Sequence, residues 1–426
     1  MSIDPPATIA VLGAGPIGLE TTLYARYLGY DVVTFERGQP AENVRRWGHV
    51  QLFSPFRMNR STLGLAALTA QDETYNPPDD DALLTGDAWA DRYLVPLAES
   101  DLVVDSLRLN SRVIAVGRAD YGKQALPGDA RRADSPFIIL YADGTGQELV
   151  EQVDVVIDTS GTYGNPNHLG QGSIPARGES AAQNYIEFGL PDVQGKDRAH
   201  YEGRRILVVG AGYSAATSVV TLAELATQSP TTTVTWVTRG SIEKPGEPIR
   251  RIADDRLQAR DRLAAEANRL AGDAKGPVTH WGATVVTAVE YLDDARQFRV
   301  ELAGAEPGTF TFDRVVANVG YRPDSELYGE LQIHECYATG GPIKLAASLL
   351  GQESADCLDQ PRSEAATLTN PEPNFFILGS KSYGRNSNFL FSVGLDQIRE
   401  LFALLGGRAN LNLYASAQCS TKPQQP

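Results

Sequence analysis

Two stretches of the sequence decide the fold: TIAVLGAGPIG at residues 8–18 and RILVVGAGYSA at residues 205–215. In each, a short apolar run leads into a glycine-rich turn, a helical stretch follows, and a second apolar run comes after it. Short apolar runs rich in β-branched residues are typical of strands that are buried on both faces of a parallel sheet. Each stretch therefore predicts a β-α-β unit.

The first motif has the spacing Gly-x-Gly-x-x-Gly, formed by Gly13, Gly15 and Gly18. The first glycine permits a tight turn, the second leaves room for a pyrophosphate against the backbone, and the third lets helix and strand pack closely. The unpaired amides at the helix start attract the phosphates. Glu36 ends the next strand, where a carboxylate accepts both hydroxyls of an unphosphorylated ribose. This context favours a dinucleotide site over a structural turn with a surface glutamate.

The second motif contains Gly210, Gly212, Ser214 and Ala215, with alanine in place of the third glycine. The residue that ends its second strand is Arg239 rather than an acid. A guanidinium at this place fits a 2′-phosphate, so the second site is predicted to prefer NADPH to NADH. The alternative interpretation of Arg239 is a solvated surface arginine.

The domain organisation is predicted from two segments that mirror each other. A strand at 154–158 runs into a crossing rich in Gly, Pro and Asn, and a strand at 313–319 runs into a similar turn. We therefore expect an α/β fold of two Rossmann-like dinucleotide-binding domains, the NADPH domain inserted into the FAD domain. The expected boundaries are 1–165 and 326–415 for the FAD domain, 166–325 for the NADPH domain, and 416–426 for a disordered, polar tail.

Composition excludes several classes of protein. The 426 residues carry 38 basic and 53 acidic side chains, a net charge of −15 that argues against nucleic-acid and anionic-membrane partners. Three cysteines cannot form a disulfide framework, which is typical of cytoplasmic proteins. We expect no secretory signal and no membrane span, because the start lacks a basic segment and no apolar run reaches about 18 residues.

Through these two motifs, the chain resembles the two-dinucleotide-binding flavoproteins of the pyridine-nucleotide-disulfide oxidoreductase superfamily. This superfamily includes thioredoxin reductases and flavin-containing monooxygenases. Three further segments carry the resemblance over most of the chain: DTSGTYGNP at 158–166, VVANVGYRPD at 315–324 and ILGSKS at 377–382. The resemblance implies FAD at the first site and NADPH at the second.

The resemblance also implies roles for single residues. Trp47 would contact FAD, and Asn59 would be the catalytic-site residue that hydrogen-bonds to the flavin or to bound oxygen species. Gly379 and Ser380 would lie beside the flavin, with Ser380 bonded to a ribityl hydroxyl. A helix that starts near Gly394 would direct its positive end at the pyrimidine edge of the flavin.

The cysteines favour one branch of the superfamily. Cys336, Cys357 and Cys419 are too far apart in sequence for a local redox pair. The chain therefore lacks the cysteine pair that passes electrons on in the disulfide-reductase branch of the superfamily. The flavin-monooxygenase branch fits better, although VQGKDRAH at 193–200 departs from the motif of that branch, so the chain is a relative and not a typical member. We expect an FAD-dependent, NADPH-driven monooxygenase that oxygenates a small molecule with O2 through a flavin hydroperoxide.

Two alternatives stay open. One is an electron-transfer reductase that acts on a disulfide, a quinone or a protein; the other is a low-turnover redox-sensing flavoprotein. No metal site is expected, because the segment 334–336 with Cys357 matches no zinc spacing. The sequence names neither the substrate nor the oligomeric state, and it leaves a homodimer open.

Overall fold

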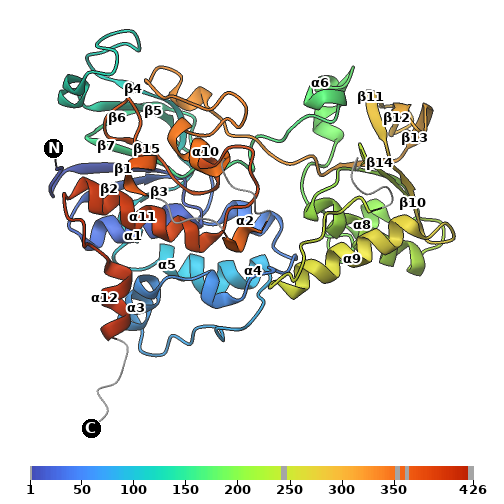
Figure 1. Ribbon diagram of the computed structural model, residues 1–426, viewed down its shortest axis with the longest axis horizontal. Coiled ribbons are helices and arrows are strands. Elements are labelled where there is room, and N and C mark those ends of the chain that lie inside the picture. Colours follow the sequence, from blue (N-terminus) through green and yellow to red (C-terminus); the bar gives the residue numbers. More distant parts are fainter. Residues whose placement is uncertain (1, 241–246, 351–355, 360–363, 421–426) are drawn as a thin grey trace. The chain divides into compact units, whose positions relative to one another are not determined.

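The computed structural model describes residues 2–240, 247–350, 356–359 and 364–420. The chain divides into two compact units: unit 1, from residues 1–165 and 322–426, and unit 2, from residues 166–321. Each unit is built on a parallel β-sheet with helices on one face (Figure 1). The predicted fold class, two Rossmann-like units with the second inserted into the first, is confirmed. No helix among the described residues is long and apolar enough to cross a membrane.

The central sheet of unit 1 has five strands in the order β15-β7-β1-β2-β3, and every neighbouring pair is parallel. Strand β1 lies in the middle, with Leu12 in register with Phe35 on one side and with Asp158 on the other. The strands are β1 (Thr8–Leu12), β2 (Asp31–Phe35), β3 (Leu107–Arg108), β7 (Val155–Asp158) and β15 (Phe375–Ile377).

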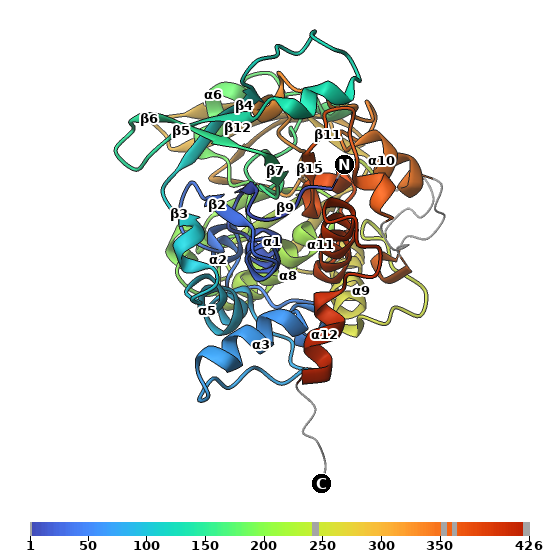
Figure 2. The same ribbon diagram turned by 90° about the vertical axis from the view of Figure 1, so that its left-hand side faces the viewer.

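Alternating side chains of β1 place the sheet of unit 1 between two layers. Ile9 and Val11 join the core under the helices, whereas Ala10 and Leu12 join the core under an antiparallel sheet. Helices α1 and α11 pack against each other on the helical face (Figures 1 and 2). The helices of unit 1 are α1 (Pro16–Tyr27), α2 (Glu42–Arg46), α3 (Thr62–Gln71), α4 (Gly86–Trp89), α5 (Val95–Ala98), α10 (Ile343–Leu350), α11 (Phe391–Leu405) and α12 (Leu413–Ser420), and its antiparallel strands are β4 (Arg112–Arg118), β5 (Phe137–Ala142) and β6 (Glu148–Val153).

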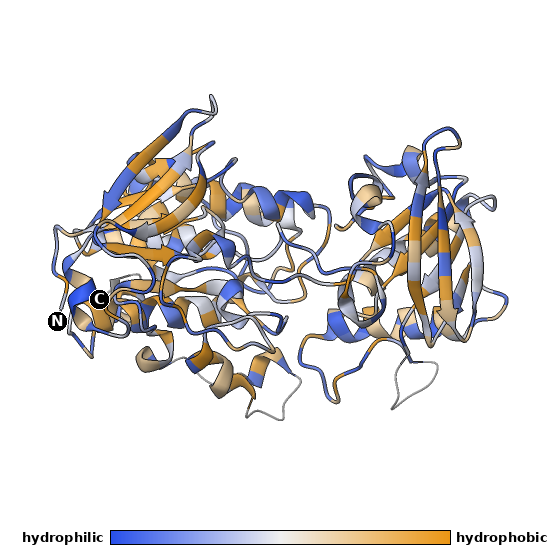
Figure 3. Ribbon diagram, turned by 90° about the horizontal axis from the view of Figure 1, so that it is seen from above, coloured by the Kyte–Doolittle hydropathy of each residue, from blue (hydrophilic) through white to orange (hydrophobic). Residues whose placement is uncertain are grey.

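Unit 2 repeats this layering around the parallel sheet β10-β9-β8-β14. Helices cover one face, and the antiparallel sheet β11-β12-β13 covers the other. Hydrophobic and hydrophilic bands alternate along the antiparallel strands, as expected for strands with one buried face (Figure 3). The elements are β8 (Arg205–Val209), β9 (Thr233–Val237), β10 (Val278–Trp281), β11 (Thr284–Leu292), β12 (Gln297–Gly304), β13 (Gly308–Phe312), β14 (Arg314–Ala317), α6 (Glu179–Ala182), α7 (Arg198–Tyr201), α8 (Tyr213–Gln228) and α9 (Gln258–Gly272).

Helix α11 starts earlier than the sequence predicted. It begins at Phe391, after an extended N-cap at Leu390, and Gly394 lies inside its first turn. A Cβ at Gly394 would come within 3.0 Å of Ile17 Cγ1 in α1. Gly394 is therefore explained by the close packing of two helices, and the prediction that it marks the helix start is wrong by about one turn.

The predicted disorder of residues 416–426 is wrong for its first part, because α12 continues to Ser420. Tertiary contacts hold this helix: the ring of Tyr414 packs edge-on against that of Tyr24 at 5.2 Å, and the Thr62 hydroxyl donates to the Tyr414 carbonyl at 2.5 Å. A polar composition does not reveal such contacts. Residues 421–426 lie outside the described part of the chain.

A cluster of buried charges lies at the amino end of β15. We call Arg118, Arg132 and Glu372 the amino-edge cluster. All three side chains are buried, with Arg118 Nε 2.8 Å and Arg132 Nη2 2.7 Å from the Glu372 carboxylate. Backbone carbonyls, those of Ser135 and Ala125 among them, accept further hydrogen bonds from the two arginines. The cluster joins the antiparallel sheet of unit 1 to the segment that leads into β15.

One carboxyl group is fully buried in α1. Glu20 Oε1 accepts a hydrogen bond from the hydroxyl of Tyr93, while Glu20 Oε2 has no hydrogen-bond partner among the described residues. Burial disfavours the charged form and raises the pKa of the Glu20 carboxyl to about 7, although the hydrogen bonds from Tyr93 and Ser61 lower it. The folded protein therefore keeps this proton at pH values where the unfolded chain has lost it.

This buried acid predicts a specific pH dependence of stability. The unfolded carboxyl ionises near pH 4.5, so the folded state should lose about 3 kcal/mol as the pH rises from there to about 7. The side chain of Gln in the variant Glu20→Gln does not ionise, so it contributes no such pH dependence. The difference in unfolding free energy, wild type minus variant, should therefore fall over this pH range and then level off. Urea unfolding of both proteins between about pH 5 and 8 measures the difference. A difference independent of pH would contradict this account.

Candidate dinucleotide sites

Three turns meet at the carboxyl edge of the sheet in unit 1. They follow the neighbouring strands β1, β7 and β15, and they span residues 13–18, 159–161 and 379–383. A Cβ built on Gly13 would lie 3.1 Å from Ser160 Cα, and one on Gly161 would lie 3.7 Å from Ser380 Oγ. The carboxyl edge of a parallel sheet is where ligands of open α/β folds bind.

The glycines of the first turn fall into two groups. Gly13 has φ +101°, and a Cβ on Gly18 would overlap the carbonyl oxygen of Gly13, so the chain itself requires glycine at both positions. Gly15, the N-cap of α1, has φ −77°, and a Cβ there would meet no heavy atom within 4 Å. Neither conformation nor packing requires glycine at this position, whereas a ligand pressed against the backbone would.

Glu36 lies beside this turn, as the sequence predicted for a ribose-binding acid. Its Oε2 accepts a hydrogen bond from the Ala14 amide at 2.8 Å, and its Oε1 accepts one from the Gly38 amide at 3.0 Å. A carboxylate offers about four acceptor positions, so capacity for two hydroxyl donors is left. The two amides fix the carboxylate at the edge of the glycine turn.

Unit 2 has the same arrangement. Gly210 has φ +138°, and a Cβ there would overlap the carbonyl oxygen of Asn318. Gly212 is the N-cap of α8, with extended backbone and no heavy atom within 4 Å of a built Cβ. Ala215 is fully buried beside Gly210, and the indole of Trp236 donates to the Gly210 carbonyl at 2.8 Å. Here too the second glycine is the one that the fold does not explain.

The polar residues predicted for the second site are exposed. Ser214 lies in the first turn of α8. Arg239 comes shortly after β9, and its Nη1 donates to Ser173 Oγ at 3.2 Å. Because an exposed guanidinium bonded to one neutral hydroxyl keeps most of its donors, it is available to a phosphate. Residues 241–246, which follow, lie outside the described part of the chain.

The two residues assigned by resemblance near the flavin have different surroundings. The Trp47 ring packs on Gly86, where a Cβ would lie 2.8 Å from it, and its Nε1 is buried without a hydrogen-bond partner among the described residues. The Asn59 carboxamide is buried and bonds to the turn at Ser54 and Pro55, with Nδ2 3.0 Å from each carbonyl oxygen. Asn59 thus holds a turn, and its contact with a ligand stays a prediction.

The turn after β15 is held mainly by its own neighbours. Gly379 has φ +73°, and its amide donates to Gln397 Oε1 in α11 at 2.8 Å. Gln397 Nε2 in turn donates to Ser382 Oγ at 2.9 Å. Ser380 lies between these fixed points and is only partly buried, whereas Gly379, Lys381, Ser382 and Tyr383 are buried.

Sequence reasoning missed two residues of this edge, Asp158 and Lys381. Asp158 ends β7 and is fully buried, and Lys381 Nζ lies 2.6 Å from its Oδ2. The signal that could have found them is an aspartate closing an otherwise apolar strand, because a buried carboxylate needs a partner. Nothing local in the sequence indicates which cation supplies it.

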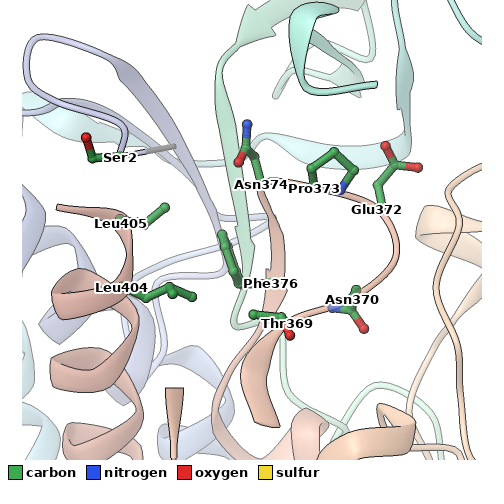
Figure 4. Close-up of a pocket in the computed structure, with 9 residues that line it drawn as sticks. All are labelled: Ser2, Thr369, Asn370, Glu372, Pro373, Asn374, Phe376, Leu404 and Leu405. Atoms are coloured by element: carbon green, nitrogen blue, oxygen red, sulfur yellow. The ribbon is translucent and has the colours of Figure 1, made fainter. Parts of the chain in front are cut away.

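A pocket of about 360 Å³ lies at the opposite end of β15, and Asn374 and Phe376 are among its lining residues (Figure 4). Glu372, which also lines it, has its carboxylate bound by Arg118 and Arg132. The pocket thus offers no free charged group, and the glycine turns are at the other edge of the sheet. We assign no chemistry to it.

The thiols and potential metal ligands form no site among the described residues. Cys336 and Cys357 are buried, and neither forms a disulfide among the described residues. Hydrogen bonds from Thr339 and Ala338 lower the pKa of the Cys336 thiol. Glu335 accepts a hydrogen bond from Tyr328 at 2.7 Å, and no cluster of three or more His, Cys, Asp or Glu side chains in the described ranges could hold a metal ion.

No protein-family model matches the sequence, and no curated protein matches it. Solved structures do match. The bacillithiol disulfide reductase Bdr (YpdA) from Bacillus cereus has a TM-score of 0.65 at 16% identity, covering 94% of this chain and 99% of its own. The cadaverine monooxygenase DfoA from Erwinia amylovora, bound to FAD, has a TM-score of 0.60 at 14% identity, covering 94% of both chains.

The ornithine N-hydroxylase KtzI from Kutzneria sp. 744, solved with reduced FAD, NADP+ and L-ornithine, has a TM-score of 0.60 at 14% identity and covers 95% of this chain and 100% of its own. Reductases and monooxygenases thus share this fold. The chain therefore has the same two-domain fold as these structures, as the motifs predicted.

The glycine geometry makes a prediction about Gly15. Gly15→Ala fits the backbone without a clash, and the lower entropy of the unfolded chain is offset by the poorer N-cap preference of alanine, so the protein without ligand should keep its stability within about 1 kcal/mol. The same methyl group should strongly weaken binding of FAD, the dinucleotide that the sequence predicts for this turn. Thermal unfolding and equilibrium FAD binding measure the two effects.

The matched control is Gly117→Ala in β4, where a built Cβ also meets no heavy atom within 4 Å. This variant should bind FAD like the wild type. If Gly15→Ala also bound FAD like the wild type, the first turn would not be the pyrophosphate site.

Proposed function

We propose that the protein is a flavin-dependent oxidoreductase that binds FAD in unit 1 and NADPH in unit 2. The observation that carries the proposal is the pair Gly15 and Gly212: each caps a helix at the carboxyl edge of a parallel sheet, and a side chain would fit at each. Two structures of similar fold, the cadaverine monooxygenase and the ornithine N-hydroxylase, are described with FAD.

In unit 1, named residues would hold the pyrophosphate, the adenosine ribose and the ribityl chain of FAD. The amides at the start of α1 would hold the pyrophosphate beside Gly15, and Glu36 would accept the hydroxyls of the adenosine ribose. Ser380 would bond to the ribityl chain, and the ring of Trp47 would contact FAD. Bound FAD supplies the acceptance of hydride and the onward transfer of electrons, while the protein supplies binding and orientation.

In unit 2 the charge pattern supports NADPH. Helix α8 starts at Gly212 and would hold the pyrophosphate on its first amides. Arg239 would pair with the 2′-phosphate through charge-assisted hydrogen bonds. Because the net charge of the protein is −15, a local cation is needed to attract a phosphate.

For the electron acceptor, we propose oxygen, with a small molecule as the oxygenated substrate. Cys336 and Cys357 lie in different segments of unit 1 and form no disulfide among the described residues, which supports a reaction without a dithiol of the enzyme. The similarity to an ornithine hydroxylase and a cadaverine hydroxylating enzyme suggests small amines as first substrates to test. The second candidate is reduction of a low-molecular-weight disulfide, favoured by the TM-score of 0.65 with the bacillithiol disulfide reductase.

One experiment separates the two candidates. The FAD-loaded protein is given NADPH with ornithine or cadaverine in air, and NADPH with bacillithiol disulfide without oxygen. Oxygen-dependent NADPH consumption with a hydroxylated amine supports the monooxygenase, and anaerobic consumption with release of thiol supports the reductase. The variant Cys336→Ser/Cys357→Ser/Cys419→Ser should keep monooxygenase turnover. If the variant lost turnover while NADPH still reduced its FAD, the result would support a thiol relay instead.

The choice of nucleotide depends on Arg239. Arg239→Ala should raise the Michaelis constant for NADPH about ten- to a hundredfold, because two charge-assisted hydrogen bonds to the 2′-phosphate are lost. The constant for NADH, which lacks this phosphate, should hardly change. Anaerobic reduction of the flavin, titrated with each nucleotide, gives both constants.

Arg269→Ala is the matched control, since Arg269 is an exposed arginine of the same unit, on α9, that pairs with Glu266 at 2.7 Å. It should leave both constants unchanged. Equal effects of Arg239→Ala on NADPH and NADH would show that Arg239 is an ordinary surface residue.

A further inference from the structure

A buried ion pair joins two of the turns at the carboxyl edge of unit 1. Lys381 belongs to the turn after β15, and its side chain is 1% exposed. Its Nζ donates to Asp158 Oδ2 at 2.6 Å and to Ser160 Oγ at 3.1 Å. Asp158 and Ser160 belong to the end of β7 and the turn after it, so the pair links segments that are more than two hundred residues apart in sequence.

The pair holds Ser160 particularly firmly. Asp158 Oδ1 accepts hydrogen bonds from both the amide and the hydroxyl of Ser160, at 3.0 and 2.6 Å. With the bond from Lys381, three contacts fix this residue. Ser160 Cα in turn lies 3.1 Å from the Cβ position of Gly13, so the place of Ser160 also limits the glycine turn after β1.

Stability alone does not account for this pair. Removing two charges from water carries a large desolvation penalty, and apolar side chains of similar volume often stabilise a core as well or better. A lysine bonded to a carboxylate does fix direction and distance more tightly than apolar packing does. The two turns also approach each other near the pair. A Cβ built on Gly161 would lie 3.7 Å from Ser380 Oγ.

We propose that Asp158 and Lys381 are a positioning pair that fixes the turn 159–161 and the turn 379–383 at the spacing that FAD requires. The inference rests on the proposed function, because it assigns FAD to this edge. Asp158 and Lys381 are buried below the turns and act through Ser160 and Ser380, so they are positioning residues. Without the pair, the two turns must be ordered again on binding, and the affinity for FAD falls.

The amino-edge cluster provides a matched control. Glu372 precedes β15 and Lys381 follows it, so the same strand has a buried ion pair at each end. Arg132 is as buried as Lys381 and is paired at 2.7 Å. Each of Lys381→Met and Arg132→Met removes one buried cation, at opposite edges of the sheet. Lys381→Met leaves Asp158 without this cation, whereas Arg132→Met leaves Glu372 paired with Arg118.

Two measurements test the proposal. Hydrogen exchange of the protein without ligand should show faster exchange at 159–161 and 379–384 in Lys381→Met, and unchanged exchange there in Arg132→Met. The dissociation constant of FAD, from quenching of its fluorescence, should rise about tenfold or more in Lys381→Met and stay within about twofold in Arg132→Met. Lys381→Arg keeps the charge and should recover part of the affinity.

Each outcome has one meaning. If Lys381→Met binds FAD like the wild type, or if Arg132→Met weakens binding equally, the pair has only a general structural role and the proposal is wrong. If the wild type itself does not bind FAD, the proposed function is wrong. Should Lys381→Met fail to fold, Asp158→Asn, which keeps the size of the side chain and removes its charge, is measured in the same way with the same expected loss of affinity.

Discussion

The contact on which the structure of each unit depends is the close approach of a helix to the strand before it. In unit 1 a side chain at Gly18 would overlap the carbonyl oxygen of Gly13, and in unit 2 the Cβ of Ala215 in α8 lies 3.5 Å from the Cβ position of Gly210 in the turn after β8. This contact places the start of α1 and of α8 at the carboxyl edge of a sheet, where helix amides face outward. Gly15 and Gly212 keep the backbone at both helix starts free of side chains.

The two edges of the sheet in unit 1 have different tasks. At the amino edge, the charges of the amino-edge cluster pair with one another, and its arginines also donate to backbone carbonyls. These bonds join the layers of the unit. At the carboxyl edge, the bonds of Asp158 and Lys381 lead to turns that present Ser160 and Ser380. The bonds of the amino-edge cluster thus stay between the layers of the unit, whereas those of Asp158 and Lys381 end at the turn that follows β7.

Much of this architecture is predictable from local sequence, since glycine spacing and short apolar runs determine strand, turn and helix within about 20 residues. The fold class and the strands around both glycine turns follow from that pattern. The pairing of Asp158 with Lys381 does not, because no local signal connects positions so distant in the chain. The start of α11 at Phe391 and the helical residues before Ser420 were missed for a related reason, as packing against Ile17 and Tyr24 outweighs local composition.

We propose that one chain binds FAD and accepts hydride from NADPH. An anaerobic titration of the FAD-loaded protein with NADPH, followed by the visible absorbance of the flavin, tests it most directly. The account predicts that FAD binds at one molecule per chain and that about one equivalent of NADPH bleaches it, with NADH less effective at the same concentration. A protein that binds no FAD, or whose bound FAD keeps its colour under excess NADPH, would contradict the account.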